Sequence, residues 1–286
     1  MFEKKYLAFL LALGLLCTAC GTGEKSVKKY VVPNEEIKVA QEDLFTAQEV
    51  AKRWPLKKRE ANTPRITGIC YHEVLDDPKD GYAIPPRMFR QHLREFKAAG
   101  YNFVDVSDLK AYVEQQKPLP KNPLFISFDD GYLNNYTYAY PILKAEGAKA
   151  TFFLVAGSMC GKNRMTWSQM KEMLADGMQF GCHTMNHEFL VGMTPAQLKV
   201  ELVDSKKMLE DKLGTEIYAI AYPCGYATPE VLAEVKKSYK LGFYANVDPE
   251  REETIFTFNR FGVYKWNNHI DSIFKQKQPK LKKKLK

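Results

Sequence analysis

Two histidines and a pair of adjacent aspartates are the residues in this sequence most suited to chemistry. His183 and His187 lie four residues apart, so they can face the same way from one helical turn or tight loop. Asp130 would add an oxygen ligand and complete a site of two imidazoles and one carboxylate, which leaves positions open for water. Zinc suits these ligands, and cobalt, nickel or iron also fits them. Such a metal lowers the pKa of bound water to about 7 and polarises a carbonyl, which is the chemistry of hydrolysis.

Each motif has an ordinary explanation when it is taken alone. The Asp-Asp-Gly sequence at 129–131 is a common turn, because glycine adopts a positive φ and aspartate bonds to nearby backbone. The histidines can be surface or core residues, and Tyr222-Pro-Cys-Gly225 can simply close a loop. Only a shared location would make these motifs one site, and that location depends on the elements that carry them.

Short apolar runs alternate with helical patterns from Arg65 onward, which is typical of repeated βα units and a mainly parallel sheet. No Gly-x-Gly-x-x-Gly follows the first run, so an open dinucleotide-binding sheet is disfavoured. The pattern predicts an α/β fold, a distorted or incomplete (β/α) barrel of about seven strands. The expected strands are Ile66–Tyr71, Asn102–Val106, Leu124–Phe128, Ala150–Val155, Met178–Cys182, Ile217–Ala221, Gly242–Val247 and a last one within Phe256–Val263.

Helix-start signals separate these strands. Thr194 and Thr166 are each followed three residues later by glutamine, which predicts two capping boxes, and Thr228 precedes proline. The longest predicted helix runs from Pro195 to Leu213 and ends at Gly214.

Polar clusters follow four of the predicted strands directly: Tyr71-His72, Asp129-Asp130-Gly131, His183 to His187, and Tyr222 to Gly225. In a parallel barrel all four would meet at the rim formed by the carboxyl ends of the strands. Barrel enzymes hold their active sites at that rim.

The motifs Ser127-Phe-Asp-Asp-Gly131, His183-Thr-Met-Asn-His187 and Tyr222-Pro-Cys-Gly225 resemble, in this order, those of the NodB-homology polysaccharide deacetylases, carbohydrate esterase family 4. The resemblance covers Ile66 to Val263 and is greatest to the branch that deacetylates poly-N-acetylglucosamine of the biofilm matrix. It implies a hydrolase that releases acetate from N-acetylglucosamine-type residues of an extracytoplasmic polysaccharide and uses a divalent metal, zinc first.

The resemblance also implies a role for each matching residue. Asp129 would be the general base, while Asp130, His183 and His187 would hold the metal. The backbone N–H of Cys224 would stabilise the oxyanion.

The sequence departs from the family pattern at three points. Ala221 stands where the family often has an arginine, and we expect Arg260 to orient Asp129 instead, because a guanidinium binds a carboxylate through two hydrogen bonds. Cys224 replaces an aromatic residue, which changes the wall of the sugar pocket. No Leu-x-His motif supplies the usual general acid. His72, at the predicted rim, is the candidate for touching substrate or assisting proton transfer, with a structural histidine as the alternative.

The N-terminus has the pattern of a bacterial lipoprotein signal. Lysines precede the apolar run Leu7–Leu16, and Thr18-Ala19 stand before Cys20, as in a lipobox. We expect a signal peptide at 1–19, lipidation of Cys20, a mobile tether at 20–62, the deacetylase domain at 63–270 and a basic tail at 271–286. These features predict an exported protein that is anchored to the bacterial membrane on its periplasmic or cell-surface face. An ordinary signal peptide or an uncleaved anchor is the alternative.

The formal net charge of +8 is partly concentrated in this tail. The tail is either a solvated end or a contact for anionic lipid or polymer. Nucleic acid is excluded as a partner of an exported chain without a recognisable binding module. The mature domain would keep four cysteines, Cys70, Cys160, Cys182 and Cys224, and the sequence leaves their pairing open. The sequence makes no prediction of oligomeric state.

Three other functions compete with this one. A polysaccharide-binding protein of the same fold would need a degenerate site, whereas all four implied catalytic and metal-binding residues are present. A glycosidase also uses paired carboxylates, but it needs no histidine pair. A deacetylase of peptidoglycan rather than of poly-N-acetylglucosamine would meet the same acetamide.

Overall fold

The computed structural model describes residues 27–40, 44–56 and 58–275. The predicted signal peptide, Cys20 and residues 276–286 of the basic tail lie outside these residues. Among the described residues, no helix is both long enough and apolar enough to cross a bilayer.

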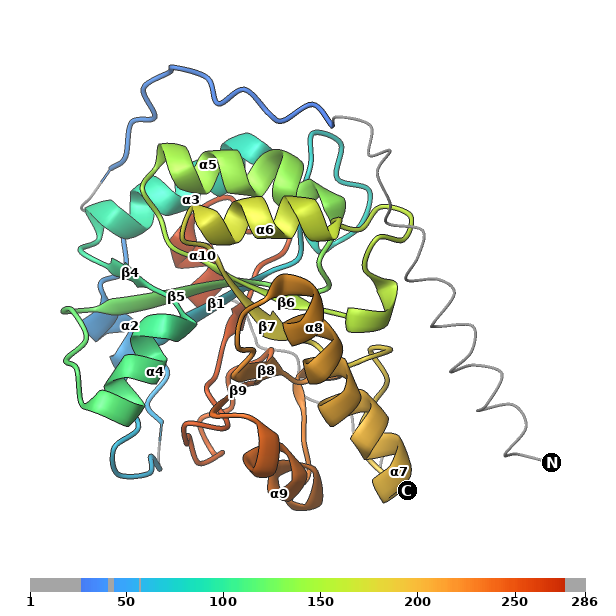
Figure 1. Ribbon diagram of the computed structural model, residues 1–286. Coiled ribbons are helices and arrows are strands. Elements are labelled where there is room, and N and C mark those ends of the chain that lie inside the picture. The colour runs from blue at the N-terminus through green and yellow to red at the C-terminus, as the bar shows by residue number, and fades with distance from the viewer. Residues whose placement is uncertain (1–26, 41–43, 57, 276–286) are drawn as a thin grey trace.

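A parallel sheet that curls on itself forms the centre of the molecule (Figure 1). Seven strands follow one another in the order β10-β1-β5-β6-β7-β8-β9, and β4 pairs with the first half of β5, while β6 pairs with its second half. The strands are β1 Thr67–Tyr71, β4 Asn102–Val104, β5 Pro123–Phe128, β6 Thr151–Leu154, β7 Gln179–Cys182, β8 Ala219–Ala221, β9 Leu241–Phe243 and β10 Phe261–Gly262. A separate small sheet pairs β2, Glu73–Val74, with β3, Ala83–Ile84.

The segment before β10 joins the two ends of the sheet. Phe258 forms a parallel bridge with Phe243 of β9, and β10, three residues further on, pairs with β1. The predicted fold class, a distorted (β/α) barrel, is therefore confirmed. Each predicted strand has a counterpart, and β4 is shorter than expected because Asp105 caps a helix that begins at Val106.

Helices cover the outside of the barrel (Figure 1). Among the described residues, α3 is the longest uninterrupted α-helix, and a π-helical stretch at Lys199–Asp204 joins α7 to α8 in one longer helical segment. The helices are α2 Ala47–Arg53, α3 Pro86–Ala98, α4 Val106–Gln115, α5 Tyr140–Ala145, α6 Trp167–Ala175, α7 Pro195–Leu198, α8 Ser205–Leu213, α9 Pro229–Ser238 and α10 Ile270–Lys275.

The predicted helix signals are present. Thr194 and Thr166 each form a capping box with the glutamine three residues later, and the side chain of Thr228 accepts a hydrogen bond from the Val231 N–H. Gly214 ends α8 with a φ of 72°. The predicted helix at 195–213 is continuous but contains the π-helical stretch, which its periodicity did not reveal.

Side chains of successive strand residues face two different cores. The even-numbered residues of β5 belong to the large core between sheet and helices, whereas Phe125 joins a smaller cluster with Phe153, Phe243 and Phe258. Because side chains alternate along a strand, this smaller cluster fills the barrel interior, where Phe125 and Phe243 stack with centroids 4.6 Å apart. Ser127 is the next inward position on β5, and polar side chains therefore replace the rings toward the rim.

Part of the range predicted as a tether packs against this barrel. In α2, Val50 is buried, and the indole N–H of Trp54 donates to the Phe274 carbonyl at 3.0 Å while its ring meets Phe261 edge-on. Ile273 and Phe274 of α10, in the range predicted as the basic tail, are also buried. These packed segments differ from the free tether and tail that composition suggested, because a few apolar residues among many charges suffice to dock a short helix. The division into tether, domain and tail stays a prediction.

Candidate active site

The two aspartates that follow β5 point in different directions. Asp129 continues the inward alternation of the strand and is 1% exposed. The backbone then turns, because Asp130 and Gly131 have φ values of 73° and 71°. Aspartate tolerates this left-handed conformation better than most residues, and a Cβ at Gly131 would come within 2.8 Å of the Met159 side chain. The turn separates the two carboxylates.

The two histidines stand on the loop after β7. The Nδ1–H of His183 donates to the Ala221 carbonyl at 2.7 Å, so its Nε2 is left as the ligand atom. Thr184 and His187 have φ values of 67° and 60°, and the His187 N–H donates to the Thr184 hydroxyl at 3.1 Å. A positive φ is costly for a β-branched residue such as threonine. The loop is therefore held in this shape by its surroundings.

Glu201 supplies much of that support. This carboxylate, 3% exposed, accepts hydrogen bonds from the backbone N–H groups of Met185 and Asn186, both at 3.0 Å, and from the Asn186 side chain at 2.7 Å. It stands on the π-helical stretch between α7 and α8. A buried carboxylate that accepts three hydrogen bonds inside one loop fixes the loop between the two histidines.

Three of the predicted residues converge as a possible metal site. The Oδ1 atom of Asp130 lies 3.6 Å from His183 Nε2 and 3.5 Å from His187 Nε2, and the three ligand atoms all lie within 4.8 Å of one another. Burial lowers the pKa of His183 more than the nearby carboxylates raise it, which favours the neutral imidazole that binds metals.

A divalent cation fits this group. Asp130 Oδ1 is buried and has no hydrogen-bond partner among the described residues, a costly state that a bound cation would relieve. Ligand atoms at about 2 Å from a tetrahedral zinc lie somewhat more than 3 Å apart, close to the distances seen here. The metal itself remains a proposal.

Arg260 binds Asp129 through both of its terminal nitrogens. Nη1 donates to Oδ1 at 2.7 Å and Nη2 to Oδ2 at 2.8 Å. Burial raises the pKa of Asp129, but the charge of Arg260 outweighs it and holds the pKa well below its usual range. The contact that the sequence suggested, with Arg260 in place of the arginine absent at Ala221, is therefore present, and its catalytic role stays a prediction.

The guanidinium of Arg260 is itself fixed inside the barrel. The residue is 0% exposed, its Nε donates to the Tyr244 carbonyl at 2.8 Å, and Nη1 also donates to the Ser127 hydroxyl at 2.9 Å. The Phe153 ring lies 5.2 Å from the guanidinium carbon. A planar group with this many partners has little freedom to rotate, so it sets the orientation of the carboxylate.

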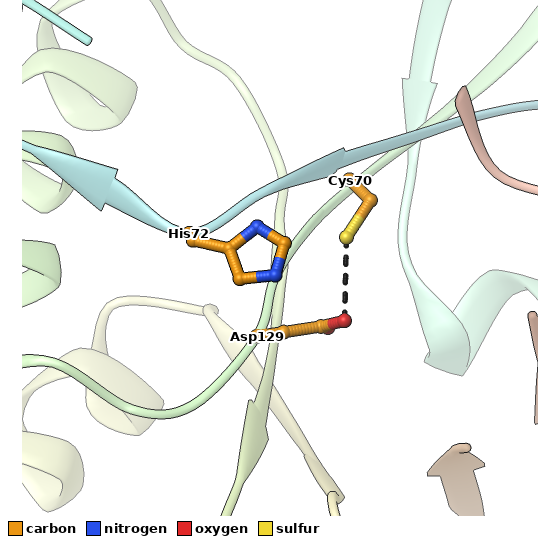
Figure 2. Close-up of side chains that lie close together, drawn as sticks. All are labelled: Cys70, His72 and Asp129. Atoms are coloured by element: carbon orange, nitrogen blue, oxygen red, sulfur yellow. Dashed lines mark hydrogen bonds between the residues drawn. The ribbon is translucent and has the colours of Figure 1, made fainter. Parts of the chain in front are cut away.

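Cys70 is a third donor to Asp129. Figure 2 shows its thiol directed at the carboxylate, and the Sγ atom lies 3.2 Å from Oδ2. Burial raises the pKa of the Cys70 thiol well above its usual value, so the thiol keeps its proton and can donate. From the sequence Cys70 was only a possible disulfide partner, whereas in the structure it is a free thiol, like Cys182 and Cys224.

His72 lies beside the same carboxylate. Its ring stands next to Asp129 in Figure 2, and ligand atoms of His72, Cys70 and Asp129 lie within 4.8 Å of one another. The His72 Nδ1 atom is buried without a hydrogen-bond partner among the described residues, and the ring contacts the Tyr82 ring with centroids 4.9 Å apart. Its location at the rim is as predicted, while its role in proton transfer stays a prediction.

Cys224 lies on the loop after β8. Its φ is 59°, its side chain is exposed, and the neighbouring Gly225, at φ 68°, comes so close to Ala245 that a Cβ would approach the Ala245 nitrogen to 2.9 Å. Within the described part of the chain we find no acceptor for the Cys224 N–H. The loop therefore presents a backbone donor, and its function as an oxyanion donor remains a prediction.

The sequence did not predict that Glu201 and Cys70 would support the site. Glu201 lies on the same helical face as Leu198 and Leu202, and an acidic residue within a buried face is a signal that could have been read. The sequence around Cys70 contains no such signal, because a thiol inside a strand is usually an ordinary core residue.

Known proteins are similar to this chain in sequence and in fold. The sequence profile of the family named polysaccharide deacetylase matches residues 116–242. YxkH, a Bacillus subtilis protein named for the polysaccharide deacetylases, is 30% identical over 263 residues, which span 89% of this chain and 91% of that protein. The chain belongs to the polysaccharide deacetylase family. It is accordingly a hydrolase of the N-deacetylase type.

Further relatives of this deacetylase carry more specific names. The poly-β-1,6-N-acetyl-D-glucosamine N-deacetylase of Staphylococcus aureus is 28% identical over 177 residues, which are 57% of this chain and 61% of that protein. The structure of the Streptococcus pyogenes deacetylase PplD in complex with acetate has a TM-score of 0.62 and 30% identity, and the match covers 69% of this chain and 92% of that one. IcaB from Ammonifex degensii has a TM-score of 0.60 and 27% identity, with coverages of 71% and 93%.

Proposed function

We propose that this deacetylase is a metal-dependent enzyme that hydrolyses the acetamide of N-acetylglucosamine residues in an extracytoplasmic polysaccharide and releases acetate. The observation that carries the proposal is the division of labour between adjacent aspartates. Asp130 lies close to His183 and His187 with a buried oxygen that has no hydrogen-bond partner among the described residues, while Asp129 is held separately by Arg260.

Each group at the rim has a defined task in this proposal. A divalent cation held by Asp130, His183 and His187 would supply Lewis acidity, polarising the acetamide carbonyl and acidifying water. Asp129 accepts the proton from the attacking water. The Cys224 N–H donates to the carbonyl oxygen as negative charge develops there. His72, beside Asp129, is the candidate for proton transfer to the leaving amine.

The relatives support a substrate of the poly-N-acetylglucosamine type. The Staphylococcus aureus relative is named for poly-β-1,6-N-acetyl-D-glucosamine. We propose this polymer, as a component of the biofilm matrix, as the substrate. Peptidoglycan presents the same acetamide, and a panel of defined oligosaccharides of both polymers separates the two by mass spectrometry. A loss of one acetyl mass from the β-1,6-linked oligomers alone is the expected result.

We further propose that a lipid on Cys20 places the enzyme on the outer face of a bacterial membrane. The support is the sequence motif before Cys20 alone. Labelling of cells with a radioactive fatty acid tests it, because the wild-type chain should take up the label and a Cys20→Ala variant should not. An unlabelled wild-type chain would contradict the anchor without touching the enzymatic proposal.

Acetate release from N-acetylglucosamine oligomers tests the reaction. We expect release to stop in the presence of a chelator and to return with added zinc, and cobalt or nickel to substitute in part. His187→Ala should lose both the metal, measured by elemental analysis of the purified protein, and activity. The matched control is His269→Ala, which removes another partly exposed histidine that binds Glu95 at 2.6 Å and belongs to neither candidate metal group. Full activity in the presence of the chelator would refute the metal dependence. The absence of acetate release under every condition would favour a binding protein of the same fold.

A further inference from the structure

A row of aromatic rings runs outward from the catalytic rim. His72, beside Asp129, contacts Tyr82 with ring centroids 4.9 Å apart, and Tyr82 contacts Tyr264 at 5.4 Å. Tyr264 then stacks on Trp266 at 4.9 Å with an interplanar angle of 10°. Three of these rings stand on two segments that are far apart in sequence, the connection between β2 and β3 and the connection between β10 and α10. We call Tyr82, Tyr264 and Trp266 the ring row.

The ring row is exposed where aromatic side chains are normally covered. Tyr82 is 51% exposed and Trp266 is 57% exposed, two of the few large apolar side chains that the described residues leave open to solvent. An exposed group of rings that touch one another is a typical mark of a binding surface. Trp266 packs one face on Tyr264, so the exposure belongs to the remainder of the indole.

Hydrogen bonds fix the two segments that carry the rings. The Lys265 N–H donates to the Gly81 carbonyl at 2.9 Å, which ties the segments together. The Asp80 carboxylate accepts from the Tyr82 N–H at 2.7 Å, and the Asn267 side chain accepts from the Tyr264 N–H at 2.8 Å. The rings are therefore positioned in advance, which lowers the entropy that a ligand must overcome on binding.

The chemistry of the surface fits a sugar chain. A pyranose ring offers an apolar face of C–H groups and a polar edge of hydroxyls, and tyrosine and tryptophan offer a flat apolar face with one polar atom. The row begins at His72, next to the carboxylate that would accept the proton. A polysaccharide whose reacting residue lies at Asp129 can therefore reach these rings through successive contacts that begin at His72.

We propose that the ring row binds the sugar residues of the polysaccharide next to the one being deacetylated, and so makes the enzyme prefer long chains. The inference rests on the proposed function, since it places the reacting residue at Asp129.

Direct binding and turnover test the inference separately. Binding of a β-1,6-linked N-acetylglucosamine pentamer is measured by calorimetry on the full chain in the presence of a chelator, so that turnover is suppressed. Trp266→Ala and Tyr82→Ala should each raise the Kd about tenfold, whereas Trp266→Phe, which keeps a ring, should retain most of the affinity. Turnover is compared on the dimer and the pentamer, and Trp266→Ala should raise KM for the pentamer more than for the dimer.

A partly buried tyrosine on another element serves as the control. Tyr112→Ala changes α4 near Asn62 and Ile255, far from the ring row in sequence, and should leave the Kd for the pentamer unchanged. Thermal unfolding of every variant checks that the fold is intact.

Two outcomes separate this inference from the proposed function. If the pentamer binds through Trp266 and no acetate is released, the inference stands and the proposed reaction fails. If acetate is released and neither Kd nor KM responds to the loss of Trp266 and Tyr82, the inference is overturned. Loss of sedimentation with anionic vesicles in Trp266→Ala, with unchanged pentamer affinity, would also overturn it and assign the rings to a membrane.

Discussion

Replacing Arg260 by lysine tests how the catalytic carboxylate is held. Arginine makes two parallel hydrogen bonds to Asp129, and it also bonds the Tyr244 carbonyl and the Ser127 hydroxyl. Lysine keeps the positive charge but has a single nitrogen, so it can reproduce only part of this arrangement. The change therefore separates the orientation of the carboxylate from the charge beside it.

The contacts give the expected magnitude. A hydrogen bond to a charged group contributes about 1.5–3 kcal/mol, and Arg260→Lys removes at least one of the two to Asp129. If the loss falls on the transition state, kcat decreases roughly ten- to a hundredfold, since each 1.4 kcal/mol is a factor of ten. Arg260→Ala leaves a buried unpaired carboxylate and should also destabilise the fold by about 3–5 kcal/mol.

Initial rates of acetate release from the pentamer provide the assay, with the stability of each variant measured by urea unfolding. Arg251→Lys is the matched control, because Arg251 packs on the Tyr244 ring at 4.0 Å and binds the Asn246 side chain at 3.1 Å. It should retain full kcat. A kcat of Arg260→Lys within twofold of wild type, in a folded protein, would refute the reasoning.

Three further changes have defined expected results. Glu201→Gln weakens the hydrogen bonds at Met185 and Asn186. It should lower metal occupancy at limiting zinc, as measured by elemental analysis, and excess zinc should restore activity. Cys70→Ala removes one neutral donor from Asp129 and should lower kcat less than tenfold; a larger loss would mean that the thiol does more than position the carboxylate. Burial lowers the pKa of His92 to about 4, so the unfolded chain binds a proton near pH 6.5 and the folded chain only near pH 4. Stability should therefore fall as the pH falls between these values, and urea midpoints of His92→Gln should show a weaker fall.

The fold could be predicted because its signals are local. Alternation of apolar runs with capped helices located every strand of the barrel, and the capping boxes at Thr166 and Thr194 formed as expected. The closure of the barrel between β9 and β1 was harder to predict, because Phe258 and β10 form only short pairings with these two ends of the sheet. Such short pairings leave little periodic pattern in a sequence.

The convergence of the three candidate metal-binding residues could be predicted, whereas the residues that support them could not, and their role as ligands stays a prediction. Asp130, His183 and His187 lie in short motifs next to strands, so sequence spacing and barrel geometry together bring them to one rim. Glu201 and the ring row act across long sequence separations, and their partners depend on how the helices and loops dock. The contact of Arg260 could be predicted only indirectly. Position 221 is an alanine and not an arginine, so Asp129 required a cationic partner from elsewhere in the chain.

The adjacent aspartates differ because the barrel gives them different surroundings. Asp129 follows the alternation of β5, which points it into the barrel interior. There Ser127 comes from β5 itself, Cys70 from the neighbouring strand β1, and Arg260 from the segment just before β10. A carboxylate buried there must be paired with a cation. Asp130 departs from the alternation through its left-handed φ, and its Oδ1 atom lies close to both histidines with no hydrogen-bond partner in the described part of the chain. One turn of backbone thus separates a carboxylate paired with Arg260 and Cys70 from one whose Oδ1 atom has no partner among the described residues, and the proposed metal-dependent hydrolysis requires this division.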